Sequence, residues 1–229
     1  MAEAVLIYGK SGSGKSRSMI NFAEDEILLV NVCGKRQPFK KQFKYVYNSD
    51  NYENIKAQLF KMPCMAAVID DAGYLMSNEW MSKHSKPKSG SSSFDIYNEI
   101  ADHFYDLLVF IKNCLPPEKI VYIILHEESN DYGDVKLRTI GKLLDQKVCI
   151  EGMVTICLRC VAQDKQHMFS VQSNGQDISK SPEDMFETAT IPNDLKFVDM
   201  TIREYYNFPS EPTSVCSAVE ITTSTKVGR

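Results

Sequence analysis

The chain has 229 residues, 43% of them hydrophobic, which is enough to bury the core of one α/β domain with additions. Its formal net charge of −4 excludes a globally basic surface, so nucleic-acid binding would need local basic loops or an oligomeric channel. No apolar run approaches the ~20 residues of a membrane-spanning helix, and the N-terminal residues do not resemble a signal peptide.

Strands and helices alternate through the first part of the chain. An apolar strand is predicted at residues 4–8, followed by a glycine-rich turn and a helix at about 15–23. Strands are also expected at 27–32 and 45–47, and helical periodicity covers 51–61, with Ser49 and Asp50 as candidate caps. This alternation is typical of a sheet whose strands are mostly parallel.

The second part of the chain continues the alternation and then adds a hairpin. A core strand at 66–70 is followed by a Lys/Ser/Gly-rich loop, a helix at 94–114 and a continuously apolar strand at 120–125. Residues 152–161 and 166–172 predict a β-hairpin. We therefore expect an α/β fold, with a mostly parallel sheet and an antiparallel hairpin extension. It would form one domain over residues 1–207, followed by a flexible tail over 208–229.

Residues 9–16 match the G-x-x-x-x-G-K-[ST] pattern of the phosphate loop and directly follow the first strand. Glycines let several backbone N–H groups face one concavity, and the N-terminus of the next helix adds partial positive charge. The pattern predicts a nucleoside triphosphate site, the alternative being a Gly/Ser loop without a ligand. Lys15 would reach the β- and γ-phosphates, and Ser16 would bind Mg²⁺. The residues expected to bind ATP are Gly9, Lys10, Ser11, Gly12, Ser13, Gly14, Lys15 and Ser16.

Two further strand ends carry polar residues suited to phosphate chemistry. Asp70 ends the apolar run 66–69 and is the predicted Mg²⁺ aspartate of a Walker B motif. Asp71 would orient or deprotonate the attacking water, or else cap a turn near Gly73. His126 ends the strand at 120–125, where ligands of parallel sheets bind, so it would sense the γ-phosphate. An ordinary polar strand end is the alternative for His126.

The seven cysteines are odd in number and scattered, and several lie in apolar runs. This distribution suits free thiols in a reducing cytosol, so we expect a cytoplasmic protein. Cys157 and Cys160 have C-x-x-C spacing, but no second pair or histidine cluster accompanies them. An alternating strand explains the spacing as well as a zinc or redox site does.

The chain resembles a known family in several segments besides the two Walker motifs. These segments are residue 126 and residues 136–145, 151–153, 173–175, 179–182 and 191–196. Together they resemble the phage-encoded AAA-type ATP-binding proteins, a group similar to the Sak-type RecA-core single-strand annealing proteins of tailed bacteriophages. The resemblance covers about residues 4–206 and is most specific at the Walker motifs.

The resemblance implies a RecA-like core that binds ATP between subunits of a homo-oligomeric ring or filament. It would act on single-stranded DNA during phage recombination or replication, with a phage recombination or single-strand-binding protein as a partner. RecA-like ATPases usually place a catalytic glutamate at the end of the second core strand, whereas Asn31 stands at that point here. Either Asp71 takes this role or hydrolysis is slow.

Basic and aromatic residues interleave in segment 34–45, which carries five basic and three aromatic residues. Neutralised phosphates and stacked bases are how proteins hold single strands without sequence preference. A solvated loop whose aromatic side chains pack on the core is the alternative. A basic loop after the Walker B region is a second candidate, and segment 131–136 a weaker third. The predicted DNA contacts are Lys35, Arg36, Phe39, Lys40, Lys41, Lys44, Lys83, Lys86 and Lys88.

RecA-like sites are usually completed by a basic finger from a neighbouring subunit, which stabilises charge on the γ-phosphate. The candidates are Arg138, Arg159 and Lys180, and Lys180 is preferred because it follows the hairpin. Two other functions remain open. One is a nucleotide-locked oligomeric assembly module that hydrolyses little ATP. The other is a small-molecule or nucleotide kinase, although no arginine-rich lid segment follows the phosphate loop.

Overall fold

A computed structural model describes residues 1–85, 93–141, 143–164 and 166–209. Within them, nine strands form one mixed sheet, with the order β3-β2-β4-β5-β1-β7-β8-β9, and β6 pairs with β5 outside this path. The first six strands in this order, which end with β7, are parallel to one another. Strands β6, β8 and β9 are antiparallel to their partners. The predicted α/β class with a mostly parallel sheet and an antiparallel extension is therefore confirmed. The strands are β1 Glu3–Gly9, β2 Ile27–Asn31, β3 Tyr45–Asn48, β4 Ala66–Asp70, β5 Ile120–Ser129, β6 Val135–Leu137, β7 Ile156–Gln163, β8 Gln166–Ser170 and β9 Thr190–Pro192.

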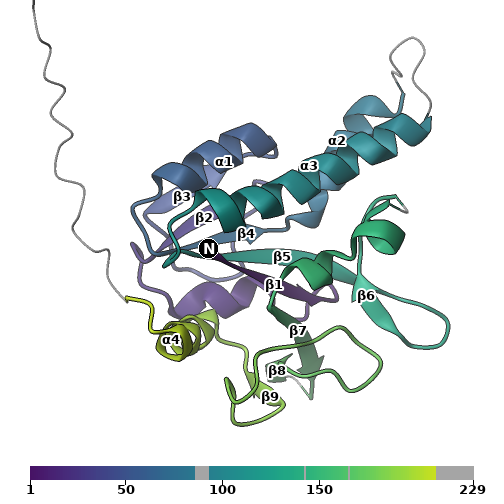
Figure 1. Ribbon diagram of the computed structural model, residues 1–229. Coiled ribbons are helices and arrows are strands. Elements are labelled where there is room, and N and C mark those ends of the chain that lie inside the picture. The colour runs from purple at the N-terminus through teal and green to yellow at the C-terminus, as the bar shows by residue number, and fades with distance from the viewer. Residues whose placement is uncertain (86–92, 142, 165, 210–229) are drawn as a thin grey trace, which may run out of the picture.

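Helices cover both faces of the sheet (Figure 1). On one face lie α1 (Tyr52–Lys61), α2 (Gly73–Lys83) and α3 (Ser93–Cys114), and on the other lie the 3₁₀ helix η1 (Ser16–Asn21) and α4 (Leu195–Tyr206). Two short turns, η2 (Leu144–Val148) and η3 (Ile150–Met153), precede β7. The result is a three-layer sandwich in which the central strands have no exposed face.

Neighbouring residues of each central strand pack into different cores, because successive side chains of a strand point to opposite faces. In β1, Leu6 packs below α1 and α3, whereas Val5 and Ile7 pack against η1 and α4. The same alternation runs through β4 and β5. It explains the continuously apolar sequences of these strands, and it leaves their C-terminal ends as the places where polar side chains gather.

Several elements differ from the sequence prediction. The helix expected at 15–23 is only η1, because Phe22 turns into an extended conformation and buries its ring beside Tyr122. The cap of α1 is Asn51, whose side chain accepts the N–H of Asn54, and not Ser49 or Asp50. Helices α2 and α4 were not predicted. Strand β5 extends beyond residue 125 to Ser129 and pairs with β6.

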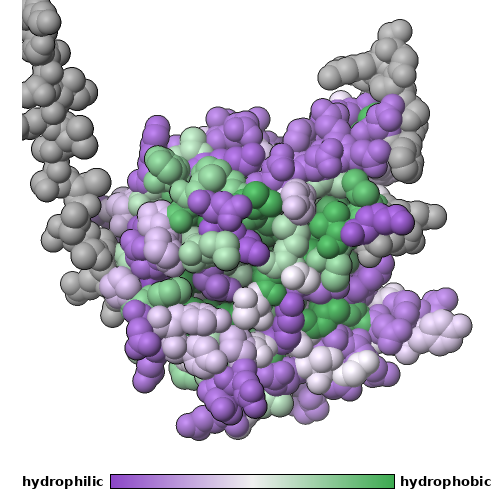
Figure 2. All heavy atoms as spheres, viewed as in Figure 1, coloured by the Kyte–Doolittle hydropathy of each residue, from purple (hydrophilic) through white to green (hydrophobic). Residues whose placement is uncertain are grey.

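Within the described residues, no helix has the length and apolar character that crossing a membrane requires. Figure 2 shows apolar side chains across the centre of the viewed face and polar ones along much of its outline. The predicted tail lies almost wholly outside the described residues, which end at Pro209. Its flexibility stays a prediction.

Helix α4 is fastened to the sheet by a buried charged network. Arg203, only 6% exposed, donates from Nε to Asp199 at 2.7 Å and from its terminal nitrogens to the backbone carbonyls of Glu118 and Met65. The hydroxyl of Tyr122 in β5 donates to the same Asp199 carboxylate at 3.0 Å. Each charge is paired and hydrogen-bonded, as burial of ions requires.

Removing the carboxylate should destabilise the fold strongly. We expect Asp199→Ala to lower the free energy of unfolding by about 3–5 kcal/mol, because the Arg203 charge would stay buried without its partner. Urea unfolding followed by circular dichroism measures the change. Glu204→Ala, an exposed position on the same helix, is the control and should change stability little. A loss below ~1 kcal/mol for Asp199→Ala would show that water replaces the carboxylate.

Candidate nucleotide site

The phosphate loop is held between β1 and the β7–β8 hairpin. A Cβ atom at Gly9 would collide with the carbonyl oxygen of Cys160, so only glycine allows β1 and β7 to lie this close. Gly12 and Gly14 have φ angles of +78° and +101°, which favour glycine. Cys160 donates its thiol to the carbonyl of Ser13 at 3.0 Å. The loop conformation is therefore fixed by β7 as well as by its own glycines.

The side chain of Lys15 folds back over the loop. Its Nζ atom donates to the carbonyls of Gly9 at 2.8 Å and Lys10 at 2.7 Å, and the residue is 6% exposed. Burial lowers the pKa of Lys15. An incoming phosphate would offer this ammonium a charged acceptor in place of two carbonyls, and hydrogen bonds between ions are about twice as strong as neutral ones.

The two predicted Mg²⁺ ligands meet in the structure. Ser16, directly after Lys15, donates its hydroxyl to Oδ1 of Asp70 at 2.9 Å. Asp70 is fully buried, and its Oδ2 atom has no hydrogen-bond partner among the described residues. Burial, together with the neighbouring Asp71, raises the pKa of Asp70. A buried carboxylate with an unused oxygen beside a hydroxyl is the environment in which a hard divalent cation is stabilising.

Asp71 lines a pocket in front of the phosphate loop, where an ammonium and an imidazole face its carboxylate. Its carboxylate pairs with the ammonium of Lys35 and lies 3.6 Å from Nε2 of His126. Burial raises the pKa of Asp71, but hydrogen bonds from His126 and Lys35 outweigh this effect and lower the pKa to about 2. Asp71 has a left-handed backbone with φ of 59°, which turns its side chain toward the loop after β2. Its side chain thus faces Lys35 and His126, while its backbone carbonyl accepts the N–H of Tyr74 in the turn that leads into α2.

The sheet register explains why these groups converge. Gly9 lies opposite His126 in the β1–β5 pair, and Asn31 lies opposite Asp70 in the β2–β4 pair. The strands end at one edge, where a pocket of about 350 Å³ opens. Its lining includes residues that sequence reasoning missed. They are Arg17, Pro38 and His167.

His167 reaches the pocket from β8 and packs on the phosphate loop. Its Nδ1 atom lies 2.7 Å from the carbonyl of Ser13, and its ring would collide with a side chain at Gly14. Nothing in the sequence near residue 167 marks it as a loop contact. Only the placement of β7 beside β1, with β8 as the next strand, brings it there.

The side chains of the basic segment after β2 lie in different surroundings. Lys35 and Arg36 turn into the nucleotide pocket, which differs from a purely DNA-facing loop. Phe39 packs edge-on against the buried Phe43, so the aromatic side chains contact the core, as the alternative interpretation proposed. Lys41 donates to the carbonyls of Ile20 and Phe22. The exposed cations left are those of Lys40 and Lys44, the latter lying over the ring of Tyr45.

A groove of about 620 Å³ runs along this segment. Lys35 and Arg36 line both the groove and the nucleotide pocket, so the two cavities share a wall. The far side of the groove is formed by Val46 and Asn48 of the edge strand β3.

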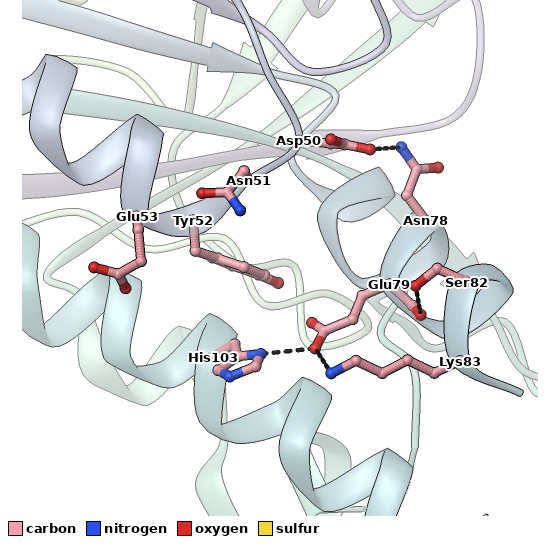
Figure 3. A pocket seen from close by; sticks show the side chains of 9 residues that line it. All are labelled: Asp50, Asn51, Tyr52, Glu53, Asn78, Glu79, Ser82, Lys83 and His103. Atoms are coloured by element: carbon pink, nitrogen blue, oxygen red, sulfur yellow. Dashed lines mark hydrogen bonds and ion pairs between the residues drawn. The ribbon is translucent and has the colours of Figure 1, made fainter. Parts of the chain in front are cut away.

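Lys83 belongs to a polar cluster away from the phosphate loop (Figure 3). It lies in the last turn of α2 and pairs with Glu79 at 2.6 Å and Glu99 at 2.9 Å, while His103 contacts the same Glu79 carboxylate. Glu79, Glu99 and His103 lie close enough to hold a metal ion, and the Lys83 ammonium pairs with both carboxylates of this cluster. DNA contact by Lys83 stays a prediction that the pairing disfavours. The predicted contacts Lys86 and Lys88 lie outside the described residues.

The candidate fingers have different environments. Arg159 is bound by Glu127 at 2.9 Å and lies 3.5 Å from Asp177, so it is engaged within its own chain. Lys180 forms a backbone bridge with Cys157 and does not line the nucleotide pocket, and Arg138 is exposed. A role for Lys180 or Arg138 in a neighbouring subunit stays a prediction.

The C-x-x-C spacing is explained by the strand. Cys157 packs in the core under α1 and α3, and Cys160 packs in the core under η1 and α4. The two thiols therefore point to opposite faces of β7 and cannot share a metal ion or a disulfide. Both are free.

The pairing of Asp71 predicts an acid-dependent loss of stability. Because its folded-state pKa of about 2 lies below the ordinary value of 3.8, the ionised carboxylate stabilises the fold above about pH 4. This contribution disappears as the pH falls through about 2. We expect Asp71→Asn, which tolerates the left-handed backbone, to be less stable than the wild type near pH 6 and equal to it near pH 2. Urea unfolding across this range measures it.

The control for this experiment is Asp106→Asn, at an exposed position on α3, which should follow the wild type at every pH. A stability difference between Asp71→Asn and the wild type that stays constant across the range would contradict the pairing. It would mean that the substitution acts through packing instead of charge.

The sequence matches no known family model and no curated protein. The resemblance to phage ATP-binding proteins therefore stays a prediction. A functional assignment depends on the geometry of the phosphate loop, the two strand-end aspartates and the basic residues that face them.

Proposed function

We propose that the chain is a RecA-like P-loop ATPase that acts on single-stranded DNA in phage recombination or replication. The observation that carries this proposal is the hydrogen bond from Ser16 to Asp70. It joins the end of the phosphate loop to the end of β4, two segments that the sequence proposes separately as halves of one Mg²⁺ site. The alternative of a Gly/Ser loop without a ligand does not explain this contact.

Each residue of the proposed site has a separate role. Ser16 and Asp70 offer oxygen ligands that would hold Mg²⁺, and the ion would supply positive charge to offset that of the phosphates. Backbone N–H groups of residues 12–16 and the Lys15 ammonium would cradle the β- and γ-phosphates. Asp71 would orient the attacking water, and His126 of β5 lies 3.6 Å from its carboxylate. Because η1 is a short 3₁₀ helix, its dipole contributes less than the sequence prediction assumed.

Strand order brings the parts of the proposed site together. Strand β5 lies between β1, which leads into the phosphate loop, and β4, which carries Asp70. His126 of β5 lies opposite Gly9 and is therefore between the two segments, as the γ-phosphate sensor of this proposal requires.

The second candidate function, an assembly module that hydrolyses little ATP, is favoured by one residue. Asn31 ends β2 beside Asp70, where RecA-like ATPases usually carry a glutamate, and its amide donates to the backbone carbonyl of Lys35 at 2.7 Å. An amide is a poor proton acceptor. Turnover would then rest on Asp71 alone, which is a weak base while it is paired.

Nucleotide binding is the first test. We expect Lys15→Ala to lower affinity for Mg–ATP by about 10- to 100-fold, because a buried charge-assisted contact with the phosphates is lost. Isothermal titration calorimetry measures it, with Lys147→Ala, an exposed lysine in η2, as the control. A wild-type protein that binds no nucleoside triphosphate would refute the proposal.

DNA coupling is the second test. We expect unstructured single-stranded DNA, but not duplex, to stimulate ATP hydrolysis by the wild type in the presence of Mg²⁺. The double variant Lys40→Ala/Lys44→Ala should weaken single-strand binding, and each lost phosphate contact should reduce the slope of log affinity against log salt by about 0.7. Unchanged binding and slope would place the DNA elsewhere. Nucleotide binding without DNA binding would favour the assembly module.

A further inference from the structure

Lys35 occupies a position that its role as a DNA contact does not explain. It is four residues beyond the end of β2, yet its ammonium pairs with Asp71 inside the nucleotide pocket, and its side chain is 49% exposed. The ammonium is therefore fixed at one end by Asp71 and open on its other side to the space in front of the phosphate loop.

A built turn holds Lys35 there. Gly34 has a φ of +62° and donates its N–H to the carbonyl of Asn31, which reverses the chain directly after β2. The buried Asn31 side chain then donates to the carbonyl of Lys35. The backbone of Lys35 is thus tied to the strand end beside Asp70, while its long side chain remains free to change partners.

The charges around Lys35 favour such a change. Asp70 and Asp71 are adjacent and both buried, and the ammonium groups of Lys35 and Lys15 lie near them. A phosphate chain with Mg²⁺ alters this balance, because the cation would neutralise Asp70 and the terminal phosphate would present several charged oxygens to the pocket.

We propose that Lys35 is a γ-phosphate contact supplied by the same chain, and that it exchanges Asp71 for the terminal phosphate when ATP binds. The exchange would release Asp71 from its ammonium partner just when a water has to be oriented beside the γ-phosphate. ADP lacks the acceptor, so Lys35 stays on Asp71 in the diphosphate complex. This inference rests on the proposed nucleotide site and adds the residue that distinguishes triphosphate from diphosphate.

The exchange makes a prediction for affinity that does not require hydrolysis. We expect Lys35→Met to lose about 10- to 100-fold in affinity for the Mg complex of a non-hydrolysable ATP analogue, and to keep its affinity for Mg–ADP within about threefold. Calorimetric titration of both nucleotides into the full chain measures the two constants. Lys61→Met, an exposed lysine at the end of α1, is the matched control and should change neither.

The outcomes separate this inference from the function on which it rests. Equal losses for both nucleotides, or no loss for either, would overturn the role of Lys35 while leaving the nucleotide site intact. A wild type that binds neither nucleotide would refute the nucleotide site itself. An equal mixture of Lys35→Met and Lys15→Ala chains gives a further test. If each site takes Lys35 from its own chain, no site in the mixture has both lysines, and none should bind the analogue tightly. The appearance of such sites would assign Lys35 to a neighbouring subunit and overturn the inference.

Discussion

Two adjacent carboxylates at the end of a strand buried on both faces impose the main constraint on this molecule. Asp70 and Asp71 cannot be solvated where β4 ends, so cations and donors must come to them from other elements. Ser16 comes from the phosphate loop, Lys35 from the turn after β2 and His126 from β5. Three strand ends thus converge on two buried carboxylates. In the proposed complex, Mg²⁺ and the phosphates would stabilise these carboxylates more than the protein's own groups do.

The sequence predicted those parts of the fold that follow from local patterns. The central strands are continuously apolar because both faces are covered, and the glycines of residues 9–14 stand where the backbone turns or approaches β7. The sequence therefore placed the phosphate loop and Asp70 correctly relative to the strands. Helix α4 was missed because its strongest constraint, the contact of Asp199 and Arg203 with Tyr122, joins residues far apart in the chain.

The same limit explains the site residues. Lys35 was assigned to DNA because its neighbours are basic and aromatic, a local signal, whereas its contact with Asp71 depends on the parallel pairing of β2 with β4. The sequence does not reveal His167 as a site residue for a similar reason. Its contact with the phosphate loop depends on the pairing of β1 with β7 and of β7 with β8. Charge type and spacing identified which residues are functional candidates, but only the sheet order determined which of them face the same cavity.

The contact between the phosphate loop and β7 has a consequence for how the protein is made. Residues 9–16 are synthesised some 150 residues before Cys160 and His167, whose carbonyl, thiol and ring fix the loop conformation. Asn193, which donates to the Cys160 thiol, comes later still. A nascent chain that already contains the phosphate loop and Asp70 therefore lacks the contacts with β7 and β8 that hold the loop in its conformation. The pocket in front of the phosphate loop can therefore form only after the β7–β8 hairpin has been synthesised.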